Sequence, residues 1–304
     1  MATKKGDLTN ILQEYLIRKT LENFEPQLYF YKLGENPVIP AGYNTIRWTK
    51  FTKLGEVSAV ASTDEGVTPT DTAFIASSVA TVTPTEYIAV ITITDRLLKE
   101  SVLDWLGGAS KALGDALART IDAKIQTTIM AGGEVMYAGN RTARANLVSG
   151  DVLTVSLLIK AAQRLKTYSA PTFDGFYVAV LHPRDAYDLM ISTSAGGWQD
   201  VHKYSQPENI FKGELGAIGG VRIVECPFIQ AVADNVYPCL VLGKGAYGVG
   251  DFESLKTFLT PGVASDSDPA VQRRKVSGKV AFGTTILQGS AMVRIEAFST
   301  DVTA

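Results

Sequence analysis

The feature that most constrains the fold is residues 94–130, where apolar side chains recur every three or four positions. Thr94 and Asp95 can cap the start of a helix, with Glu100 in its first turns. At 1.5 Å per residue, one helix over this range would be about 50 Å long, well above the usual three to four turns. Its apolar stripe comprises Leu98, Val102, Leu106, Ala109, Leu113, Ala116, Ile121, Ile125 and Ile129.

A helix of this length without coiled-coil heptads needs a partner along its whole face. We expect the C-terminal strands to supply it, rather than the strands of 43–94. Gly107, Gly108 and Gly114 lie inside the predicted helix and each cost about 1 kcal/mol relative to Ala. They indicate either a bend or a close neighbour at mid-helix.

The residues before this helix, 43–94, are rich in threonine and β-branched residues and alternate as strands do. Between the predicted strands lies 62–71, STDEGVTPTD, which is polar except for Val67. The block therefore predicts a long two-armed β-excursion with a polar tip.

Two further segments precede the excursion. Residues 8–22 have the spacing of a short amphipathic helix, and 26–42 carry three prolines that favour an extended arm. Leu28, Tyr29, Phe30 and Tyr31 have little local core to enter. We expect them to pack elsewhere, for example on a neighbouring subunit.

Beyond the long helix, residues 150–250 alternate between helix and strand, which predicts a compact α/β unit. Helices are expected over 151–168 and 184–191, and strands over 176–183, 219–227 and 236–243. Pro183 suits the first position of the second helix. From 249 onward the pattern is β again, interrupted by a polar loop at 261–270.

Composition excludes several classes of protein. Lys+Arg total 29 and Asp+Glu total 31, so no global basic excess is available to neutralise nucleic-acid phosphates. Two cysteines, Cys226 and Cys239, are too few for a secreted disulfide scaffold, and we expect both to be reduced and buried. The N-terminus has no signal-peptide core and no window could span a membrane, which predicts a soluble intracellular product.

Candidate chemistry is weak throughout. Residues 243–248 spell G-x-G-x-x-G, but no helix is expected after them, so we interpret them as a glycine-rich turn. Neither histidine, His182 or His202, has a partner at zinc-site spacing. We expect His182 at a helix start. Asp185, Asp188 and Glu225 are isolated carboxylates, so we predict no catalytic, cofactor-binding or metal site.

Basic residues form small local clusters. Arg273, Arg274 and Lys275 could face DNA or an acidic neighbour, although a solvated edge or an inter-subunit ion pair is the better interpretation. A second basic cluster consists of Arg141, Arg144, Arg164 and Lys166.

The order of elements, with the strings at 176–190, 215–227 and 279–297, resembles the major capsid proteins of tailed phages, which have the Hong Kong 97-type fold. The resemblance implies an α+β protein. It makes 1–42 an N-arm, 43–93 an extended β-hairpin called the E-loop, and 94–150 a P-domain with a long spine helix. An α/β A-domain would follow at 151–250, and the closing P-domain strands at 251–304.

The resemblance also implies a function: self-assembly into the icosahedral shell that encloses a double-stranded DNA genome. Partners would be other copies in pentamers and hexamers, a separate scaffolding protein, a portal, and DNA contacted weakly, with no membrane. The protein would be located in the virion and assembled in the host bacterial cytoplasm. The predicted inter-subunit contacts are Tyr29, Phe30, Tyr31, Trp48, Asp64, Glu65, Thr68, Asp71, Arg273 and Arg274.

Some members of this family cross-link their shells covalently through a lysine of the E-loop and an asparagine of a neighbouring subunit. The tip 62–71 contains no lysine, so we expect a non-covalent shell. The N-terminus lacks a long helical scaffolding segment of the kind that some members of this family remove by proteolysis. We therefore expect assembly to depend on a separate scaffolding protein. The alternatives are another phage structural protein of the tail, fibre or decoration type, an encapsulin-like compartment, and, least favoured, an enzyme.

Overall fold

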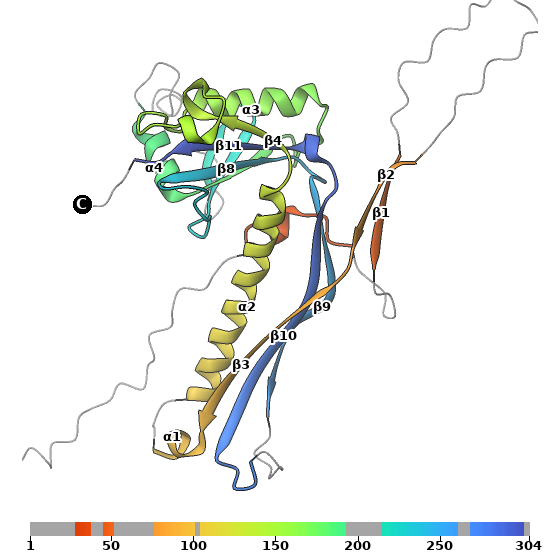
Figure 1. Cartoon of the computed structure of the whole chain (residues 1–304), viewed down its shortest axis with the longest axis vertical. Helices are drawn as coiled ribbons and strands as arrows, with labels where there is room; N and C mark the ends of the chain where they lie inside the picture. Colours follow the sequence, from red (N-terminus) through yellow and green to blue (C-terminus); the bar gives the residue numbers. More distant parts are fainter. Residues whose placement is uncertain are drawn as a thin grey trace, which may run out of the picture. The chain divides into compact units, whose positions relative to one another are not determined.

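The computed structural model describes residues 28–37, 45–51, 76–100, 104–192, 214–260 and 268–300 (Figure 1). By compactness the chain divides into two units. The first holds Met1–Gln27, Ile88–Leu117 and Leu255–Lys279, and the second holds Leu28–Tyr87, Ala118–Ser254 and Val280–Ala304. This division cuts through single helices and strands, so it does not test the domain boundaries predicted from the sequence.

The elements that pass through the first unit are two helices and three strands. The helices are α1 (Asp95–Glu100) and α2 (Trp105–Met130). The strands are β3 (Thr85–Thr94), β10 (Arg273–Ile286) and β9 (Tyr247–Leu259), which form one sheet in the order β3-β10-β9. Within this unit the Asp95 N–H donates to the Gln272 carbonyl over 2.8 Å, which fixes the start of α1 beside the start of β10.

The predicted single helix over 94–130 is wrong at its N-terminal end. α2 begins only at Trp105, because the non-helical Asp104 caps it by accepting the Gly107 N–H at 3.0 Å. Its 26 residues make it about 39 Å long. A β-carbon on Gly107 would lie 2.4 Å from the Asp104 carboxylate, so this glycine makes room for the cap.

α2 runs continuously through Gly108 and Gly114 (Figure 1). Nothing among the described residues lies within 4 Å of where a β-carbon on either glycine would be, so a close neighbour does not explain them. The predicted apolar stripe is buried only in its C-terminal part: Leu98, Leu106 and Ala109 are half-buried, and Val102 lies outside the described residues. Ala116 is exposed, and Leu117 is buried in its place. The buried stripe is Leu113, Leu117, Ile121, Ile125 and Ile129.

Strand β10 is the partner of this stripe, as predicted. Gly278 of β10 lies against Leu113 and Leu117, within 3.2 Å of where its β-carbon would stand. Farther along, in the second unit, the hydroxyls of Thr128 and Thr284 are hydrogen-bonded. Glycine and small polar residues on β10 therefore allow the strand to approach α2 closely.

The second unit contains a six-stranded mixed sheet in the order β4-β11-β8-β5-β7-β6. Helices α3 (Val155–Thr167) and α4 (Pro183–Ile191) contribute buried side chains to the same core as its strands. The strands are β4 (Glu134–Tyr137), β5 (Tyr177–Leu181), β6 (Glu214–Ile218), β7 (Val221–Glu225), β8 (Val236–Leu242) and β11 (Met292–Phe298).

This α/β unit confirms the predicted helices and strands of 150–250, but it is larger than predicted. Strands β4 and β11 come from outside that range, and β11 pairs with both β4 and β8. Gly219 and Gly220 have φ values of 61° and 86°, which close the tight hairpin between β6 and β7.

The excursion is an antiparallel pair, β1 (Ile46–Phe51) and β2 (Ala76–Val82), in which Ile46 lies opposite Val82. This pair confirms its two arms. The following strand, β3, belongs to another sheet, so strand pairing within the excursion ends at Val82. The predicted helix 8–22 and the tip 62–71 lie outside the described residues. Short 3-10 turns occur at Tyr31–Leu33, Ala138–Asn140, Arg144–Asn146 and Gly289–Ala291.

Candidate functional site

One carboxylate of α2 holds the segment that leads from the N-terminal arm. The backbone N–H groups of Tyr29 and Phe30 donate to Asp122 Oδ2 at 2.6 and 3.4 Å, and that of Tyr31 donates to Oδ1 at 3.1 Å. Burial raises the pKa of Asp122, and the three backbone hydrogen bonds oppose the rise. The Tyr247 hydroxyl donates to the Phe30 carbonyl and completes the attachment.

Phe30 is 1% exposed, buried by its own chain. The expectation that it lacks a local core is therefore wrong, and its contact with a neighbouring subunit stays a prediction that this burial does not favour. The acceptor that places it, Asp122, is more than 90 residues away in the sequence, so no local pattern could reveal it. Tyr29 and Tyr31 remain partly exposed, and their contact with a neighbour stays a prediction.

The same segment is also joined to β9. The Tyr31 hydroxyl donates to Asp251 Oδ2 at 3.2 Å, and burial, followed by the charge of Asp251, raises the pKa of Tyr31. Glu35 exchanges backbone hydrogen bonds with Tyr247 at 3.0 Å and Val249 at 2.9 Å. Residues 29–35 are therefore fixed to α2 and β9 within the second unit.

Trp48 of β1 is half-buried against Gly248, where a β-carbon would lie 2.9 Å from Trp48 Cζ2. It lines an open groove of about 400 Å³, and its predicted contact with a neighbour stays a prediction. The groove is lined by Glu35, Trp48, Thr49, Lys50, Ala80, Pro171, Lys244, Gly245, Leu287 and Gln288.

The predicted contacts Arg273 and Arg274 begin β10. Arg273 is exposed, and its Nε lies 3.9 Å from Asp268 Oδ2. The pKa of Asp268 is lowered, chiefly because it accepts the backbone N–H of Gln272. Arg274 is half-buried, and its role at a subunit contact, like that of Arg273, stays a prediction. The other four predicted contacts, Asp64, Glu65, Thr68 and Asp71, lie outside the described residues.

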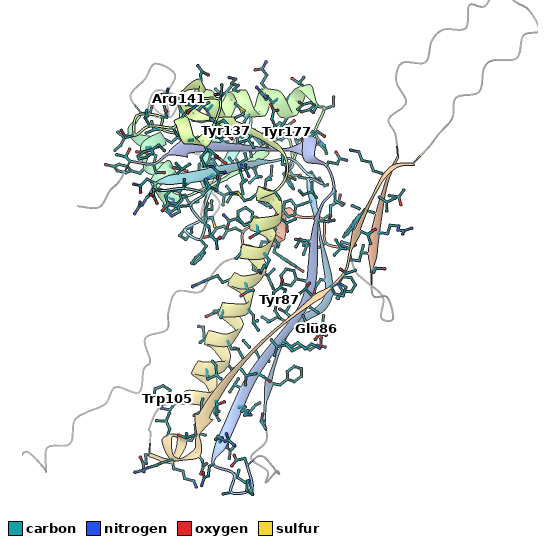
Figure 2. The ribbon with its side chains drawn as sticks, in the orientation of Figure 1. Glu86, Tyr87, Trp105, Tyr137, Arg141 and Tyr177 are labelled. Carbon is teal, nitrogen blue, oxygen red and sulfur yellow. The ribbon has the colours of Figure 1, made fainter. Side chains whose placement is uncertain are left out.

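The three arginines of the second basic cluster, Arg141, Arg144 and Arg164, are paired with carboxylates of the same chain. Arg144 forms two hydrogen bonds of 2.7 Å with the buried carboxylate of Glu296. Arg141, which is labelled in Figure 2, donates to Asp151 at 2.8 Å. Arg164 is paired with Glu134. Because these guanidinium groups already have carboxylate partners, they favour a structural role over a grip on DNA phosphates.

The polar groups weighed above for catalysis also have structural roles. His182 caps α4 by accepting the Arg184 N–H at 3.2 Å, which confirms its predicted place. Asp185 accepts the Ser299 hydroxyl, and Asp188 accepts the Thr300 N–H at 2.9 Å, so α4 holds the end of β11. Burial raises the pKa of Asp185 to about 7.

The remaining sequence motifs give a consistent picture. Gly248 of the G-x-G-x-x-G string lies inside β9, so a strand follows the motif where a dinucleotide-binding loop would open a helix. Cys226 and Cys239 are free and buried, and burial raises the pKa of the Cys226 thiol to about 11. Among the described residues, no three acidic, histidine or cysteine side chains are grouped as metal ligands.

The described helices include none that is both long and apolar enough to cross a lipid bilayer. Large apolar side chains are nevertheless exposed in the first unit. Ile88 and Val90 of β3 are 61% and 54% exposed, and Phe258 of β9 is 50% exposed. Trp105, at the start of α2, is also exposed (Figure 2). β3 and β9 are moreover the edge strands of their sheet, and such surfaces mark sites of association.

Comparison with known proteins agrees with this arrangement of elements. A family described as phage capsid protein matches residues 78–295. No curated protein sequence matches the chain.

Solved phage capsids share the fold over nearly the whole chain. The capsid of Ralstonia phage GP4 superimposes with a TM-score of 0.78 at 14% identity, covering 100% of this chain and 99% of that one. The capsid of cyanophage P-SCSP1u superimposes with a TM-score of 0.74 at 17% identity, covering 98% of this chain and 96% of that one. The capsid of cyanophage Pam1 superimposes with a TM-score of 0.75 at 12% identity, covering 96% of this chain and 98% of that one. The chain belongs to the phage capsid protein family, and its fold is the Hong Kong 97-type fold of major capsid proteins that form the shells of tailed phages.

Proposed function

We propose that this major capsid protein builds an icosahedral shell of pentamers and hexamers around double-stranded DNA. Residues 1–42 would serve as N-arm, 43–93 as E-loop, 94–150 with 251–304 as P-domain, and 151–250 as A-domain. A-domains would lie near the symmetry axes, and E-loops would cover the P-domains of neighbours. A structural role without catalysis agrees with the family and with the internal pairing of Asp185, Asp188 and Glu296.

The observation that carries this proposal is the amount of surface that the subunit leaves uncovered. Among the strands that the structure describes, β1 and β2 pair only with each other, and edge strands β3 and β9 expose apolar side chains. Identical subunits can cover such surfaces through repeated heterologous contacts that close into rings. The neutralised Arg141, Arg144 and Arg164 agree with weak contact to the packaged DNA.

A separate scaffolding protein, a portal and assembly in the host bacterial cytoplasm complete the proposal. We further propose a non-covalent shell, since residues 62–71 contain no lysine. Mature particles boiled in SDS should release single subunits. Ladders of high mass that survive this treatment would contradict a non-covalent shell.

Electron microscopy of the purified full chain, alone and co-expressed with candidate scaffolding proteins, tests the function. We expect closed icosahedral shells or sheets of pentameric and hexameric tiles. A protein that stays monomeric under all these conditions would refute the proposal. Shells that contain an enzyme cargo in place of DNA would support the encapsulin alternative.

A further inference from the structure

Helix α4 carries two carboxylates that bind the end of strand β11. Asp185 and Asp188 are three residues apart, which places them on one side of the helix. The Ser299 hydroxyl donates to Asp185 Oδ1, and the Thr300 hydroxyl donates to Asp188 Oδ1. These donors lie 114 and 112 residues beyond their acceptors in the sequence. The fold therefore brings two carboxylates and two hydroxyls together within the second unit.

The hydrogen bonds leave one oxygen of this cluster without a partner. Asp188 is satisfied on both oxygens, since its Oδ2 accepts the Thr300 N–H at 2.9 Å. Asp185 is fully buried, and among the described residues no group pairs with its Oδ2. A buried carboxylate oxygen that has lost its water and gained no partner is costly. The position therefore requires a further ligand.

The two carboxylates also act on each other electrostatically. In the cation-free subunit, burial raises the pKa of Asp185 to about 7, the hydrogen bond from Ser299 opposes the rise, and the charge of Asp188 adds to it. The two side chains are therefore close enough to repel each other when both are ionised. A positive charge shared by the pair would replace this repulsion with attraction.

Two kinds of ligand could complete the cluster, a proton or a cation. A proton cancels one of the two negative charges and makes no use of the hydroxyl oxygens. A divalent cation cancels both charges and binds carboxylate and hydroxyl oxygens alike. Each hydroxyl donates its proton to a carboxylate and still has lone pairs to offer. The set of donors therefore fits a cation better than a proton.

We propose that Asp185 and Asp188, with the hydroxyls of Ser299 and Thr300, form a binding site for a divalent cation, with Ca²⁺ as the preferred ion. All four side chains supply oxygen, the ligand that Ca²⁺ takes in proteins. Ca²⁺ accepts about six to eight oxygens in a flexible geometry, whereas Mg²⁺ demands a near-ideal octahedron. Thr300 is exposed, which gives the ion and its remaining waters access from solvent.

Such a site would fasten the end of β11 to α4. It differs from the expectation, drawn from the sequence, that these carboxylates are isolated, because the two hydroxyls come from a distant segment. Only two of its ligands carry charge, and among the described residues no third acidic, histidine or cysteine side chain joins them. The affinity should therefore be modest, with a Kd on the order of 0.1–1 mM.

Thermal unfolding of the full chain at about pH 8, in about 10 mM Ca²⁺ or in EDTA, tests the site. Ca²⁺ should raise the Tm of the unaltered subunit by about 3 °C or more, since the ion binds only the folded state. Asp185→Asn and Asp188→Asn keep the shape of the side chain and remove its charge, so each should lose most of this rise. Asp174→Asn, at an exposed carboxylate of the second unit, is the matched control and should keep it.

Hydrogen exchange of the unaltered chain locates the ion. The Ser299 N–H donates to the Asn235 carbonyl at 2.7 Å, and the Thr300 N–H donates to Asp188. Both should exchange about tenfold or more slowly in Ca²⁺ than in EDTA, because the ion holds the end of β11 in place. Strand β1, which lies outside the sheet of β11, should exchange at the same rate in both conditions.

Isothermal titration of Ca²⁺ into the unaltered chain should show one ion bound per chain. No binding and no rise in Tm would overturn the site and leave water or a proton as the partner of Asp185 Oδ2. A full response to Ca²⁺ in Asp185→Asn would place the ion elsewhere and overturn the site as well. If neither variant folds, unchanged exchange at Ser299 and Thr300 in the unaltered chain would still refute it. None of these measurements depends on whether the chain forms shells.

Discussion

Individual buried carboxylates hold distant parts of the chain together. Asp122 accepts three consecutive backbone N–H groups of 29–31. Glu296, which is fully buried, accepts two hydrogen bonds from Arg144 and forms an ion pair with Arg294. Asp185, which is fully buried, accepts a hydrogen bond from the Ser299 hydroxyl. A carboxylate in such a position is stable only when hydrogen bonds or a proton replace its lost hydration.

Replacing Asp122 by Ala should loosen the base of the arm. Three backbone donors at a largely buried site would lose their acceptor, so the free energy of unfolding should fall by about 3 kcal/mol. Urea denaturation of the subunit measures this loss. Asp115→Ala, on the same helix, is the control and should change stability by less than about 0.5 kcal/mol. Equal losses in both variants would disprove the role assigned to Asp122.

Asp185 predicts a pH dependence of stability. Its pKa is about 7 in the folded subunit, raised by burial above the ordinary 3.8, so the folded state keeps a proton that the unfolded chain releases. The associated stability is fully present below pH of about 4 and is lost as the pH rises through about 7. Over that range the loss should be about 3 kcal/mol.

Asp185→Asn checks this effect, because an amide does not titrate. Thermal unfolding followed between pH 4.5 and 8 should show a smaller decline for the variant than for the unaltered subunit. Parallel curves for the two proteins would show that Asp185 does not titrate in this range. Asp188, Ser299 and Cys239 are the groups nearest its charge, and they are unchanged in the variant.

At the scale of elements, the close approach of strands depends on small residues of β10. A β-carbon on Gly283 would lie 2.3 Å from Val82 Cγ1 and 2.7 Å from the Thr83 carbonyl oxygen, where β2 ends. The carbonyl belongs to the backbone and cannot rotate away as a side chain could. Gly283 therefore allows β10 to approach Val82 and Thr83 at the end of β2 closely.

We expect Gly283→Ala to destabilise the subunit by about 2 kcal/mol through overpacking at this crossing. Gly289→Ala is the matched control, because the nearest atom to its β-carbon would be 3.8 Å away, an ordinary contact. Differential scanning calorimetry of the two variants measures the difference. A Gly283→Ala subunit as stable as the control would mean that the hairpin can shift freely against β10.

At the scale of the whole molecule, the subunit divides its surfaces between folding and assembly. The core of the six-stranded sheet and the buried stripe of α2 are closed within one chain. Apolar side chains of β3 and β9 stay exposed on the single chain. We propose that contacts with other chains cover them. A change confined to assembly surfaces should therefore affect shells without affecting the stability of the subunit.

Deletion of residues 62–71 tests this separation, because a loop tip contributes little to the core of its own subunit. The deleted chain should unfold at the same urea concentration as the unaltered one but fail to close shells in electron micrographs. Replacing the ten residues with a Gly/Ser linker of equal length controls for chain length. If the deletion unfolds the monomer, the assignment of 43–93 to the E-loop is wrong.

The sequence by itself determined the type and order of most elements, because helix and strand periodicities are local. Pro183 correctly marked the start of α4, and the alternation at 86–94 correctly marked β3. Periodicity was less reliable for where a helix begins and for which residues face the core. Helix α2 begins at Trp105, after the cap residue Asp104. Its buried face includes Leu117 in place of Ala116.

Only the tertiary structure decided which distant segments meet. Phe30 is buried because Asp122 and Tyr247, both more than 90 residues away, hold its backbone. Strands β4 and β11 join the six-stranded sheet for a similar reason, since the strand that completes their hydrogen bonds lies far away in the sequence. Periodicity records which face of an element is buried, but only the folded chain specifies what buries it.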